Sequence, residues 1–360
     1  MGGLRKIRVV LMSFEQARWV WKNGELIPWK DATVHVSAHA LHYGSGVFEG
    51  IRCYDTAEGP AVFRLDAHLD RLYDSASVYG MEIPYNRAQL AEAVCEVIRG
   101  NGFRSCYVRP ICFFGSASLA LNPQRCPVEA VIFAWPWETY LGNKALEAGV
   151  RVTLSPWVKF HSRMLPTTAK ACGQYVNSIL AVREAMGRGY DEALLLASDG
   201  SIAEGSGENI FLVYGGKLLT NDERHSILLG VTRDAIIEIA CNLGLPVEIR
   251  AIQVNDLLSA DEAFFTGTAV EVTPIREVDG QPIGSGARGP LTAKIQQAFF
   301  AATSGRDLQY RHWLHLVASA PSKPVPASEA TSLSETQRRE IEHREGSAAR
   351  AREAAHCDPA

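Results

Sequence analysis

Apolar residues recur at every third or fourth position in several stretches of this chain, a spacing that predicts amphipathic helices. One helix is expected over residues 66–79. A second should begin at Asn86, which can cap it together with Gln89 three positions later, and should end at Gly100 or Gly102. Further helices are expected after Lys170 and after Gly230, the latter ended by Gly244. The first two helices would bury Leu69, Leu72, Ala76 and Tyr79, and Leu90, Val94, Val97 and Ile98.

Shorter apolar runs separated by pairs of turn residues predict strands. Asp199-Gly200, Gly215-Gly216 and Asp279-Gly280 each follow or separate such runs, and dipeptides of this kind are typical of β-hairpins. Consecutive hairpins favour antiparallel or mixed sheets over a doubly wound parallel sheet. The sequence therefore predicts an α+β fold.

The length of 360 residues suggests about two domains on a prior of roughly 150 residues each. The expected division is an N-terminal extension at 1–15, a small α/β domain at 16–133, an interdomain loop at 134–143 and a large domain at 144–319. Residues 320–360 are rich in Pro, Ser and Ala and then in charge, with few large apolar side chains. Such a segment buries too little to offset its ordering entropy, so we expect a disordered tail.

Composition narrows the class of partner. The net charge of −4 and the lack of a dense Lys/Arg cluster favour small-molecule substrates over nucleic acid. No apolar run approaches the ~20 residues of a membrane span, and the N-terminal stretch lacks the features of a signal peptide. The eight cysteines are scattered, with no Cys-x-x-Cys pair, which indicates reduced thiols in a cytoplasmic protein.

Two segments contain candidate chemistry. Lys170, in PTTAKACGQY, lies among small and polar residues, and a lysine held in this way can form a Schiff base with a carbonyl. Taken alone, it could equally be a solvated surface group. The segment AEGSGENIF places Glu204 and Glu208 in a glycine-rich turn, where glycine allows the backbone to approach a ligand closely. Taken alone, this segment could be a hairpin with exposed acids.

Five segments together resemble a known family. HALHYGSGVFEGIRCYD, PTTAKACGQY, EGSGENIF, LGVTRDAI and FFTGTAVEVTPI are similar, in order and spacing, to the class IV or D-amino-acid-aminotransferase-like enzymes. The likeness extends from about Trp19 to Trp313 and is closest to the bacterial branched-chain amino acid aminotransferases. It implies a pyridoxal 5'-phosphate enzyme that exchanges amino groups between L-Leu, L-Ile or L-Val and 2-oxoglutarate, giving branched 2-oxo acids and L-glutamate.

The resemblance also implies which residues bind the cofactor. Lys170 matches the lysine that bonds to the cofactor and then moves the substrate's α-proton. Glu204 matches the acid that faces the pyridine nitrogen, and Tyr175 the tyrosine that hydrogen-bonds the ring's phenolic oxygen. The matches to the phosphate site are Arg71, Val231, Thr232 and Thr268. By helical geometry Arg71 flanks an apolar face and need not be buried in the core.

On the substrate side, the resemblance implies one pocket that accepts both branched and acidic side chains. Its aromatic walls match Tyr43, Phe48, Trp137 and Tyr140. Arg109 matches the arginine that takes glutamate's distal carboxylate. The α-carboxylate site matches Tyr107, supported by Arg52, and the backbone N–H groups of Thr268 and Ala269. Because Tyr43 comes from a neighbouring subunit in the family, a homodimer or higher homo-oligomer with a shared active site is expected.

Other patterns favour less specific interpretations. His35, His39 and His42 have a spacing that could suggest a metal, but no acidic or cysteine ligand is grouped with them, so no metal site is expected. Asp191-Glu192 is interpreted as a pair of strand-edge acids, and Cys172 as a small residue rather than a redox group.

Two alternative functions are open. A D-amino-acid or (R)-amine aminotransferase, or an aminodeoxychorismate lyase, would share Lys170 and Glu204 but differ on the substrate side. A catalytically silent binding protein should have lost some of the cofactor residues, and none of them is missing.

Overall fold

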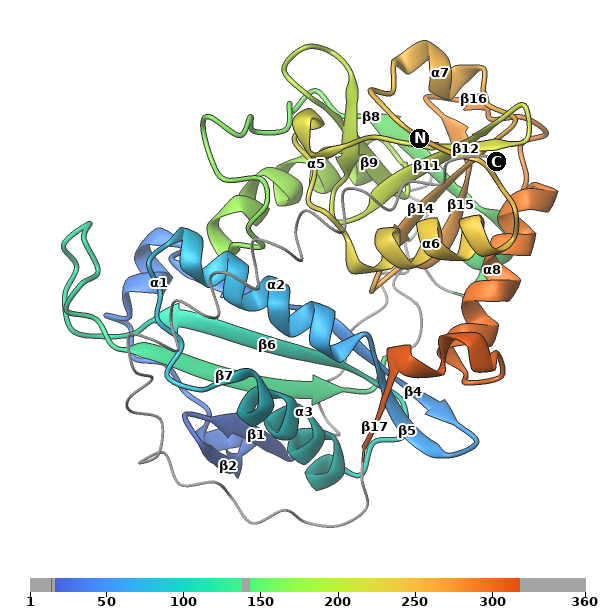
Figure 1. The fold of residues 1–360 in the computed structure, drawn as a ribbon. Coiled ribbons are helices and arrows are strands. Elements are labelled where there is room, and N and C mark those ends of the chain that lie inside the picture. The colour runs from blue at the N-terminus through green and yellow to red at the C-terminus, as the bar shows by residue number, and fades with distance from the viewer. Residues whose placement is uncertain (1–13, 15–16, 138–142, 318–360) are drawn as a thin grey trace, which may run out of the picture.

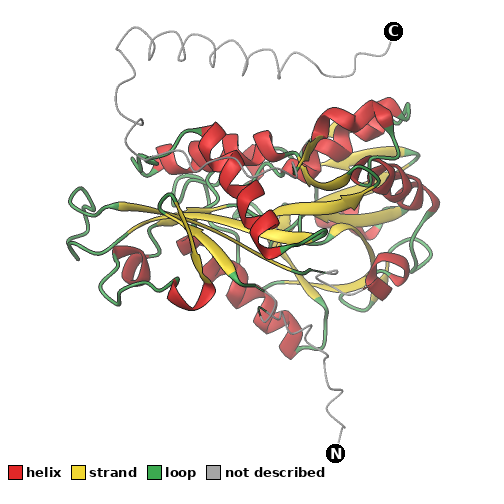
Figure 2. Ribbon diagram, turned by 90° about the horizontal axis from the view of Figure 1, so that it is seen from below, coloured by secondary structure: helices red, strands yellow, loops and turns green. Residues whose placement is uncertain are grey.

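The structure is a computed structural model that describes residues 14, 17–137 and 143–317. Its strands form two sheets that lie in separate halves of the molecule (Figure 1). The helices lie mainly on the outer sides of the strand layers (Figure 2). The α+β class predicted from the sequence is confirmed.

The first sheet is antiparallel throughout the pairs formed by its path. Its order is β17 (Leu314–Leu316), β5 (Gly59–Phe63), β4 (Ile51–Thr56), β6 (Cys106–Phe114), β7 (Val128–Trp135), β1 (Trp19–Lys22) and β2 (Glu25–Pro28), with β3 (Gly46–Phe48) paired to β6. The sequence division placed residues 314–316 with the large domain, whereas their pairing puts them at the edge of this sheet. The end of the described chain therefore returns to the half in which the chain began.

Two helices cover one face of the first sheet. They are α2 (Leu65–Val78) and α3 (Arg87–Asn101), and their apolar residues share one core with the strands. The capping box expected at Asn86 is present, since its side chain accepts from Gln89 N while the Gln89 side chain accepts from Asn86 N. Gly102, with φ of 71°, ends α3, whereas Gly100 lies inside it. The first predicted helix begins and ends one residue earlier than expected.

The second sheet is mixed. Its order is β10 (Ile202–Gly205), β9 (Glu192–Leu196), β8 (Val150–Leu154), β15 (Glu271–Val278), β14 (Glu262–Gly267), β11 (Asn209–Tyr214), β12 (Lys217–Thr220) and β13 (Val247–Ile249), with β16 (Gln281–Pro282) paired to β15. The pairs β8–β9, β8–β15 and β12–β13 are parallel. Phe211 and Phe264 face one core, whereas Ile210 and Phe265 face another. This alternation shows that both faces of the sheet are covered.

Helices complete the second half. They are α4 (Asn143–Ala148), α5 (Tyr175–Gly187), α6 (Val231–Asn242), α7 (Val254–Leu258) and α8 (Pro290–Thr303); α1 (His39–Tyr43) precedes the first sheet's β3. In the described ranges, other elements are joined by the 3-10 segments Trp29–Asp31, Cys172–Gln174, Glu223–His225 and Leu308–Trp313. None of the helices in the described part of the chain is long and apolar enough to cross a membrane.

The turn dipeptides behave in two ways. At Gly215-Gly216 and Asp279-Gly280 both residues have positive φ and the flanking residues pair directly, as in tight two-residue hairpins. At Asp199-Gly200 the connection is longer. Ala197 and Ser201 close it, and the Asp199 carboxylate accepts from the Ser201 amide and hydroxyl. A local side-chain hydrogen bond has replaced part of the strand ladder there.

Candidate active site

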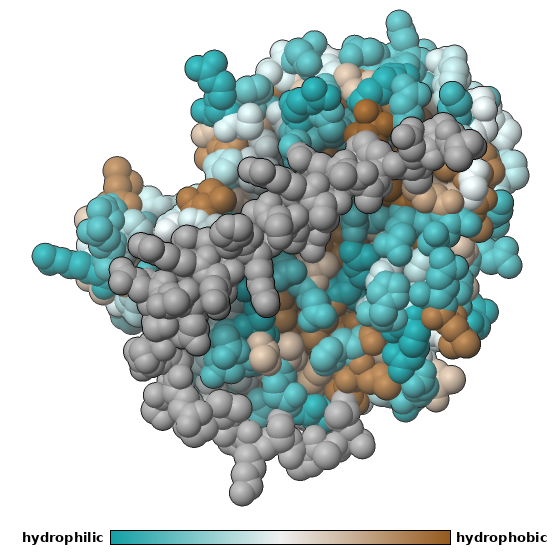
Figure 3. Space-filling view, viewed as in Figure 1, coloured by the Kyte–Doolittle hydropathy of each residue, from teal (hydrophilic) through white to brown (hydrophobic). Residues whose placement is uncertain are grey.

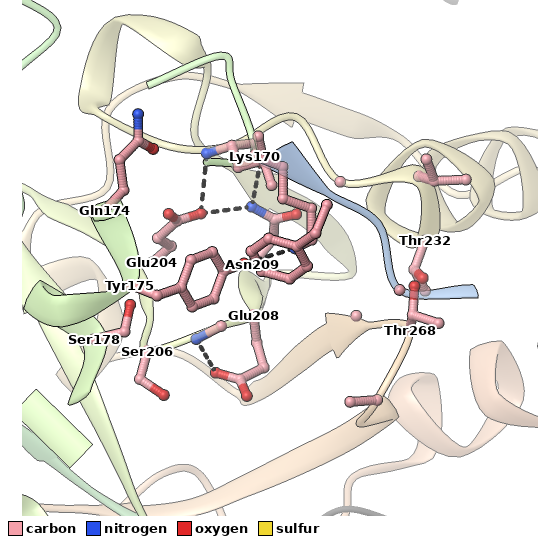
Figure 4. Close-up of a pocket in the computed structure, with 18 of the residues that line it drawn as sticks. Lys170, Gln174, Tyr175, Ser178, Glu204, Ser206, Glu208, Asn209, Thr232 and Thr268 are labelled. Atoms are coloured by element: carbon pink, nitrogen blue, oxygen red, sulfur yellow. Dashed lines mark hydrogen bonds between the residues drawn. The ribbon is translucent and has the colours of Figure 1, made fainter. Parts of the chain in front are cut away.

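A cavity of about 430 Å³ lies between the two halves of the molecule. Its walls come from the first sheet, from the segment around Lys170, from the turn between β10 and β11, and from the start of α6. Figure 4 shows Lys170, Tyr175 and Glu204 grouped on one side of it, with Thr232 and Thr268 next to each other at another. The predicted residues that line it are Phe48, Arg71, Tyr107, Arg109, Trp137, Lys170, Tyr175, Glu204, Val231, Thr232, Thr268 and Ala269.

Backbone contacts with the first half fix Lys170 at the junction. Its amide donates to Ser75 Oγ at 2.9 Å, and its carbonyl accepts from the Phe48 amide at 3.0 Å. Its Nζ donates to the Tyr175 hydroxyl at 2.6 Å. Burial, and then the charge of Arg71, lower the pKa of Lys170 to about 8. A substantial share of this amine is thus neutral near physiological pH and can act as a nucleophile or a base.

The end of the cavity near Thr232 is suited to an anion. Helix α6 begins at Val231, and its N-cap residue, Gly230, provides no side-chain cap, so the first amides of the helix stay available. The positive end of the helix dipole adds to their effect. Thr232 and Thr268 point toward the same place (Figure 4). Hydroxyl and amide donors therefore converge on one small region.

Arg71 reaches this end of the cavity from α2. Its Nε and Nη2 donate to the two oxygens of Glu49 at 2.7 and 2.8 Å, and Nη1 donates to the Leu229 carbonyl at 2.9 Å. Only 14% of the Arg71 side chain is exposed to solvent. Arg71 is therefore more deeply buried than its place beside the apolar face of the helix suggested. A guanidinium has five N–H groups, and two are left for a ligand. Burial alone would raise the pKa of Glu49, but Arg71 and His68 hold that pKa below its usual range.

Glu204 is buried at the opposite side, held by three donors. Lys159 Nζ lies 2.7 Å from Oε1, while Asn209 Nδ2 and the Leu228 amide each donate to Oε2 at 3.1 Å. Its position at the end of β10 and its burial exclude the alternative of an exposed hairpin acid. These partners fix the orientation of the carboxylate before any ligand binds.

Two further acids lie beneath Glu204. Glu208 is buried, and its Oε2 accepts from the Gly207 amide at 2.9 Å. Glu192 is also fully buried, on β9, which is an interior strand. The interpretation of Glu192 as a strand-edge acid is therefore wrong, because both faces of β9 are covered. Burial raises the pKa of Glu192 to about 7, and burial and the charge of Glu192 raise the pKa of Glu208 well above its usual value.

An arginine surrounded by aromatic rings forms the substrate-facing side. The Arg109 guanidinium carbon lies 4.6 Å from the Phe48 ring centre, 5.6 Å from that of Tyr107 and 5.9 Å from that of Trp135. No acidic side chain in the described ranges forms an ion pair with Arg109, and its Nε has no hydrogen-bond partner there. Trp137 completes the ring cluster, 4.9 Å from Tyr107. A cation is thus held among apolar walls.

Two of the predicted substrate residues, Tyr43 and Arg52, do not line the cavity of their own chain. Tyr43 does not line the cavity of its own chain; it is exposed, and its hydroxyl donates to the Leu119 carbonyl at 2.9 Å. Arg52 lies behind the cavity wall, with Nη1 2.9 Å from Glu271 Oε1 and Nη2 donating to the Ala269 carbonyl at 3.4 Å. It thereby contacts the Thr268–Ala269 turn, and its support of Tyr107 stays a prediction. Tyr140, like most of the expected interdomain loop, lies outside the described residues.

Sequence reasoning missed several residues of the cavity wall. Lys159 is the most consequential, and Phe14, Phe133, Trp135, Ser206 and Asn209 also line the cavity. A lysine in the loop between β8 and Lys170 matches no motif, so only its contact with Glu204 reveals it. Phe14 falls within the expected N-terminal extension, yet its ring stacks on Trp29 at 5.3 Å.

The histidines singled out by their spacing have other partners. His39 is hydrogen-bonded through Nδ1 to Ser45 Oγ at 2.6 Å and through Nε2 to the Ala120 carbonyl at 3.0 Å. His42 Nε2 lies 2.9 Å from the Val36 carbonyl. The contact of His39 with Ala120 holds α1 against the β6–β7 connection, and the contact of His42 joins α1 to the segment before it.

Comparison with known proteins agrees with this geometry. The model of the amino-transferase class IV family matches residues 46–278. The chain belongs to this family. The class IV relatives include the branched-chain-amino-acid aminotransferase of Pseudomonas aeruginosa, which is 47% identical over 298 residues, covering 83% of this chain and 97% of the relative.

Solved class IV structures are similar in fold as well. The branched-chain amino acid aminotransferase of Escherichia coli has a TM-score of 0.83 and 45% identity, covering 84% of this chain and 100% of that one. Another branched-chain amino acid aminotransferase, solved with pyridoxamine 5'-phosphate, has a TM-score of 0.82 and 46% identity, covering 84% of this chain and 99% of that one. The latter enzyme complexed with N-(5'-phosphopyridoxyl)-L-glutamate has a TM-score of 0.81 and 44% identity, with the same coverage.

Proposed function

We propose that this chain transfers amino groups reversibly between L-leucine, L-isoleucine or L-valine and 2-oxoglutarate, using pyridoxal 5'-phosphate. Membership of the class IV family and likeness to branched-chain-amino-acid aminotransferases support the amino-donor class. The glutamate adduct bound by a similar enzyme supports the acidic co-substrate. A cytoplasmic location stays a prediction, based on the scattered cysteines.

The cavity fits this cofactor by its donor set. A dianionic phosphate would meet the amides at the start of α6, the Thr232 and Thr268 hydroxyls and the two remaining N–H groups of Arg71. A protonated ring nitrogen would meet Glu204, which among the buried acids of the described ranges is the one whose carboxylate forms an ion pair with a lysine. Tyr175, whose pKa burial raises to about 12, remains a phenol and can donate to a phenolate oxygen.

When bound, the cofactor carries the amino group between the two substrates and withdraws electrons from the substrate's α-carbon. The chain's own residues do the rest. Lys170 Nζ, in its neutral form, would take the proton from the substrate's α-carbon and deliver it to the cofactor's C4′ carbon, on the other side of the transferred nitrogen. Tyr175, in hydrogen-bond contact with that amine, restricts its orientation. Glu204 holds the proton on the ring nitrogen, which maintains the electron withdrawal.

The observation that carries the dual-substrate proposal is the environment of Arg109. An apolar wall favours a branched side chain, while a guanidinium with no carboxylate partner in the described part of the chain can pair with an acidic one. The acidic side chain therefore does not enter the apolar pocket as an unpaired charge. One cavity can accept both classes in alternate half-reactions.

A homodimer or higher homo-oligomer with an active site shared between chains is part of the proposal. Large apolar side chains are exposed around α1, on the β6–β7 connection and on the loop before Lys170, including Val36, Leu41, Leu121 and Met164, the last two 80% and 74% exposed. Figure 3 shows hydrophobic groups at the projecting left edge of the molecule, in the half that contains the first sheet. A monomer seldom exposes so many neighbouring apolar groups. Tyr43 lies on the same surface, where it could reach a second chain's cavity.

Arg109→Met tests the substrate proposal most directly. A hydrogen bond to a charged group contributes roughly 1.5–3 kcal/mol, so kcat/KM for glutamate and 2-oxoglutarate should fall about 10- to 150-fold. Leucine and its 2-oxo acid form no such pair and should lose much less. The two half-reactions should be measured separately, with L-Leu and with L-Glu as donors.

Arg104→Met is the matched control, since Arg104 lies on the same segment but is exposed and paired with Asp55. It should affect neither donor. Equal losses for leucine and glutamate in Arg109→Met would assign Arg109 to the shared α-carboxylate or to the fold. Activity with D-alanine but not with L-leucine in the unaltered protein would favour a D-amino-acid transaminase instead.

A further inference from the structure

The ion pair between Lys159 and Glu204 lies in the cavity wall, and Lys159 belongs to none of the five segments that resemble the family. Lys159 is 8% exposed and Glu204 is 5% exposed, and their charged atoms lie 2.7 Å apart. The backbone holds the lysine in place, because the Lys159 amide donates to the Leu196 carbonyl of β9 at 2.8 Å. The loop that carries Lys159 is thereby attached to the sheet beside Glu204.

The surroundings of this pair are strongly acidic. Glu192 and Glu208 are buried beneath the same turn, and the Gly205 backbone is close enough to Glu208 that an added Cβ would lie 2.5 Å from its Oε2. Three buried carboxyl groups near one another cannot all be ionised without counter-charge. Lys159 contacts Glu204, whereas no lysine or arginine in the described part of the chain forms a salt bridge with Glu192 or Glu208.

We infer that Lys159 is a positioning residue that supplies the counter-charge of Glu204 and fixes its carboxylate where it faces the ring nitrogen of the bound cofactor. This inference rests on the placement of Glu204 proposed above. Without the lysine, Glu204 would be a buried carboxylate with no cation beside it, and burial favours the neutral form of such a group. A neutral carboxyl group can no longer stabilise a positive charge on the ring nitrogen.

The hydrogen-bond count of Glu204 supports this role. A carboxylate offers about four acceptor sites. Lys159, Asn209 and the Leu228 amide occupy three, which leaves one for the ring nitrogen. Lys159 therefore also sets which direction the remaining site faces.

The test compares the holoenzymes of Lys159→Met, Lys159→Arg and Glu204→Gln at neutral pH. The first readout is the visible absorption spectrum of bound pyridoxal phosphate, and the second is the single-turnover rate with L-leucine. Lys159→Met should shift the absorption band in the same direction as Glu204→Gln and slow the half-reaction about 10-fold or more. Lys159→Arg, which keeps the charge, should restore both. Lys22→Met is the matched control, since Lys22 is ion-paired with Glu129 and neither residue lines the cavity.

The double variant Lys159→Met/Glu204→Gln separates positioning from a merely structural role. If Lys159 acts through Glu204, the double variant has the spectrum and rate of Glu204→Gln alone. A further loss in the double variant would overturn the inference, and this comparison holds even if Lys159→Met alone does not fold. A wild-type spectrum and rate in Lys159→Met, with an altered Glu204→Gln, would also overturn it. A wild-type spectrum in Glu204→Gln would instead reject the placement of Glu204 itself.

Discussion

Lys170 shows how a single residue acquires its chemistry from its surroundings. Burial and the charge of Arg71 lower the pKa of its amine to about 8, and the Tyr175 hydroxyl holds the amine at 2.6 Å. Each of these influences comes from a different element, α2 for Arg71 and α5 for Tyr175. The motif therefore identifies the lysine, whereas the fold makes it reactive.

Replacing Lys170 with alanine should lower turnover at least about a thousandfold, because loss of a positioned general base alone costs ~10²–10⁴-fold and the covalent link is lost as well. Stopped-flow measurement of the L-leucine half-reaction gives the rate. Borohydride reduction and mass spectrometry should show cofactor attached to the unaltered chain and absent from the variant. A variant that still retains a tenth of the rate would place the base elsewhere.

The pKa of Lys170 predicts how cofactor uptake depends on pH. Only the neutral amine attacks a carbonyl, and a lowered pKa means that the protonated form predominates below about pH 8. Covalent uptake of pyridoxal phosphate by the cofactor-free protein should therefore rise about tenfold per pH unit below that value and level off above it. The absorbance change on mixing measures the rate. A midpoint near that of an ordinary lysine would show that burial does not control this amine.

At the residue scale, the sequence predicted the site residues that belong to motifs. It did not predict those that only packing between distant segments brings to the site. Lys170, Glu204 and Tyr175 lie together as the resemblance implied. Lys159 has no local signal, since a lysine in a loop resembles any solvated lysine. Glu192 was misplaced because β9 is buried on both faces, and a strand of that kind lacks the apolar–polar alternation that distinguishes inside from outside.

Close packing between strands, as well as hydrogen bonding, determines where the side chains of the cavity lie. Gly50, between β3 and β4, has no room for a side chain, since an added Cβ would lie 1.8 Å from the Tyr107 hydroxyl and 2.7 Å from Cζ. Tyr107 lies on the neighbouring strand β6 and lines the cavity. The glycine therefore sets where the Tyr107 ring can lie.

Gly50→Ala should displace Tyr107 and lower kcat/KM for leucine and glutamate alike, by about 10- to 100-fold, because a misplacement of about 1 Å can cost that much. The common loss is expected because Tyr107 would serve the α-carboxylate that both substrates share. Gly187→Ala is the control, as an added Cβ there meets nothing within 4 Å. A loss confined to glutamate would show that the displaced ring acts through Arg109.

At the element scale, helices and tight turns followed the sequence closely. The capping box at Asn86 and the hairpins at Gly215-Gly216 and Asp279-Gly280 depend on neighbouring residues, so a local reading suffices. The order of strands in each sheet depends on contacts between distant segments. The parallel pair β8–β15 joins residues more than a hundred positions apart, and no periodicity encodes such a pairing.

The whole molecule brings its two sheets together around one cavity. Residues from β3 and β6 face residues from the β10–β11 turn and the start of α6, and the C-terminal strand β17 pairs with β5 of the first sheet. Arg52 on β4 and Glu271 on β15 form a buried ion pair at 2.9 Å between the halves. The relative position of the two halves thus determines the geometry of the site.

The dimer proposal can be tested by mixing two inactive chains. If Tyr43 acts in the cavity of the neighbouring chain, Tyr43→Ala and Lys170→Ala homodimers should each have low activity. Chains exchanged between them would form heterodimers. In such a heterodimer one cavity combines the intact Lys170 of one chain with the intact Tyr43 of the other.

Activity should therefore return on subunit exchange. The expected level is that of one complete site per heterodimer, because the second site carries both substitutions. Light scattering should show at least two chains per particle, and the same mass before and after exchange. The control is a mixture of Arg109→Met with Lys170→Ala. Arg109 and Lys170 line the same cavity of one chain, so each site of the heterodimer keeps one of the two substitutions. The rate of the glutamate half-reaction should therefore stay low. If the Tyr43 mixture likewise gains nothing despite demonstrated exchange, Tyr43 acts within its own chain, and the apolar surface around it has another role.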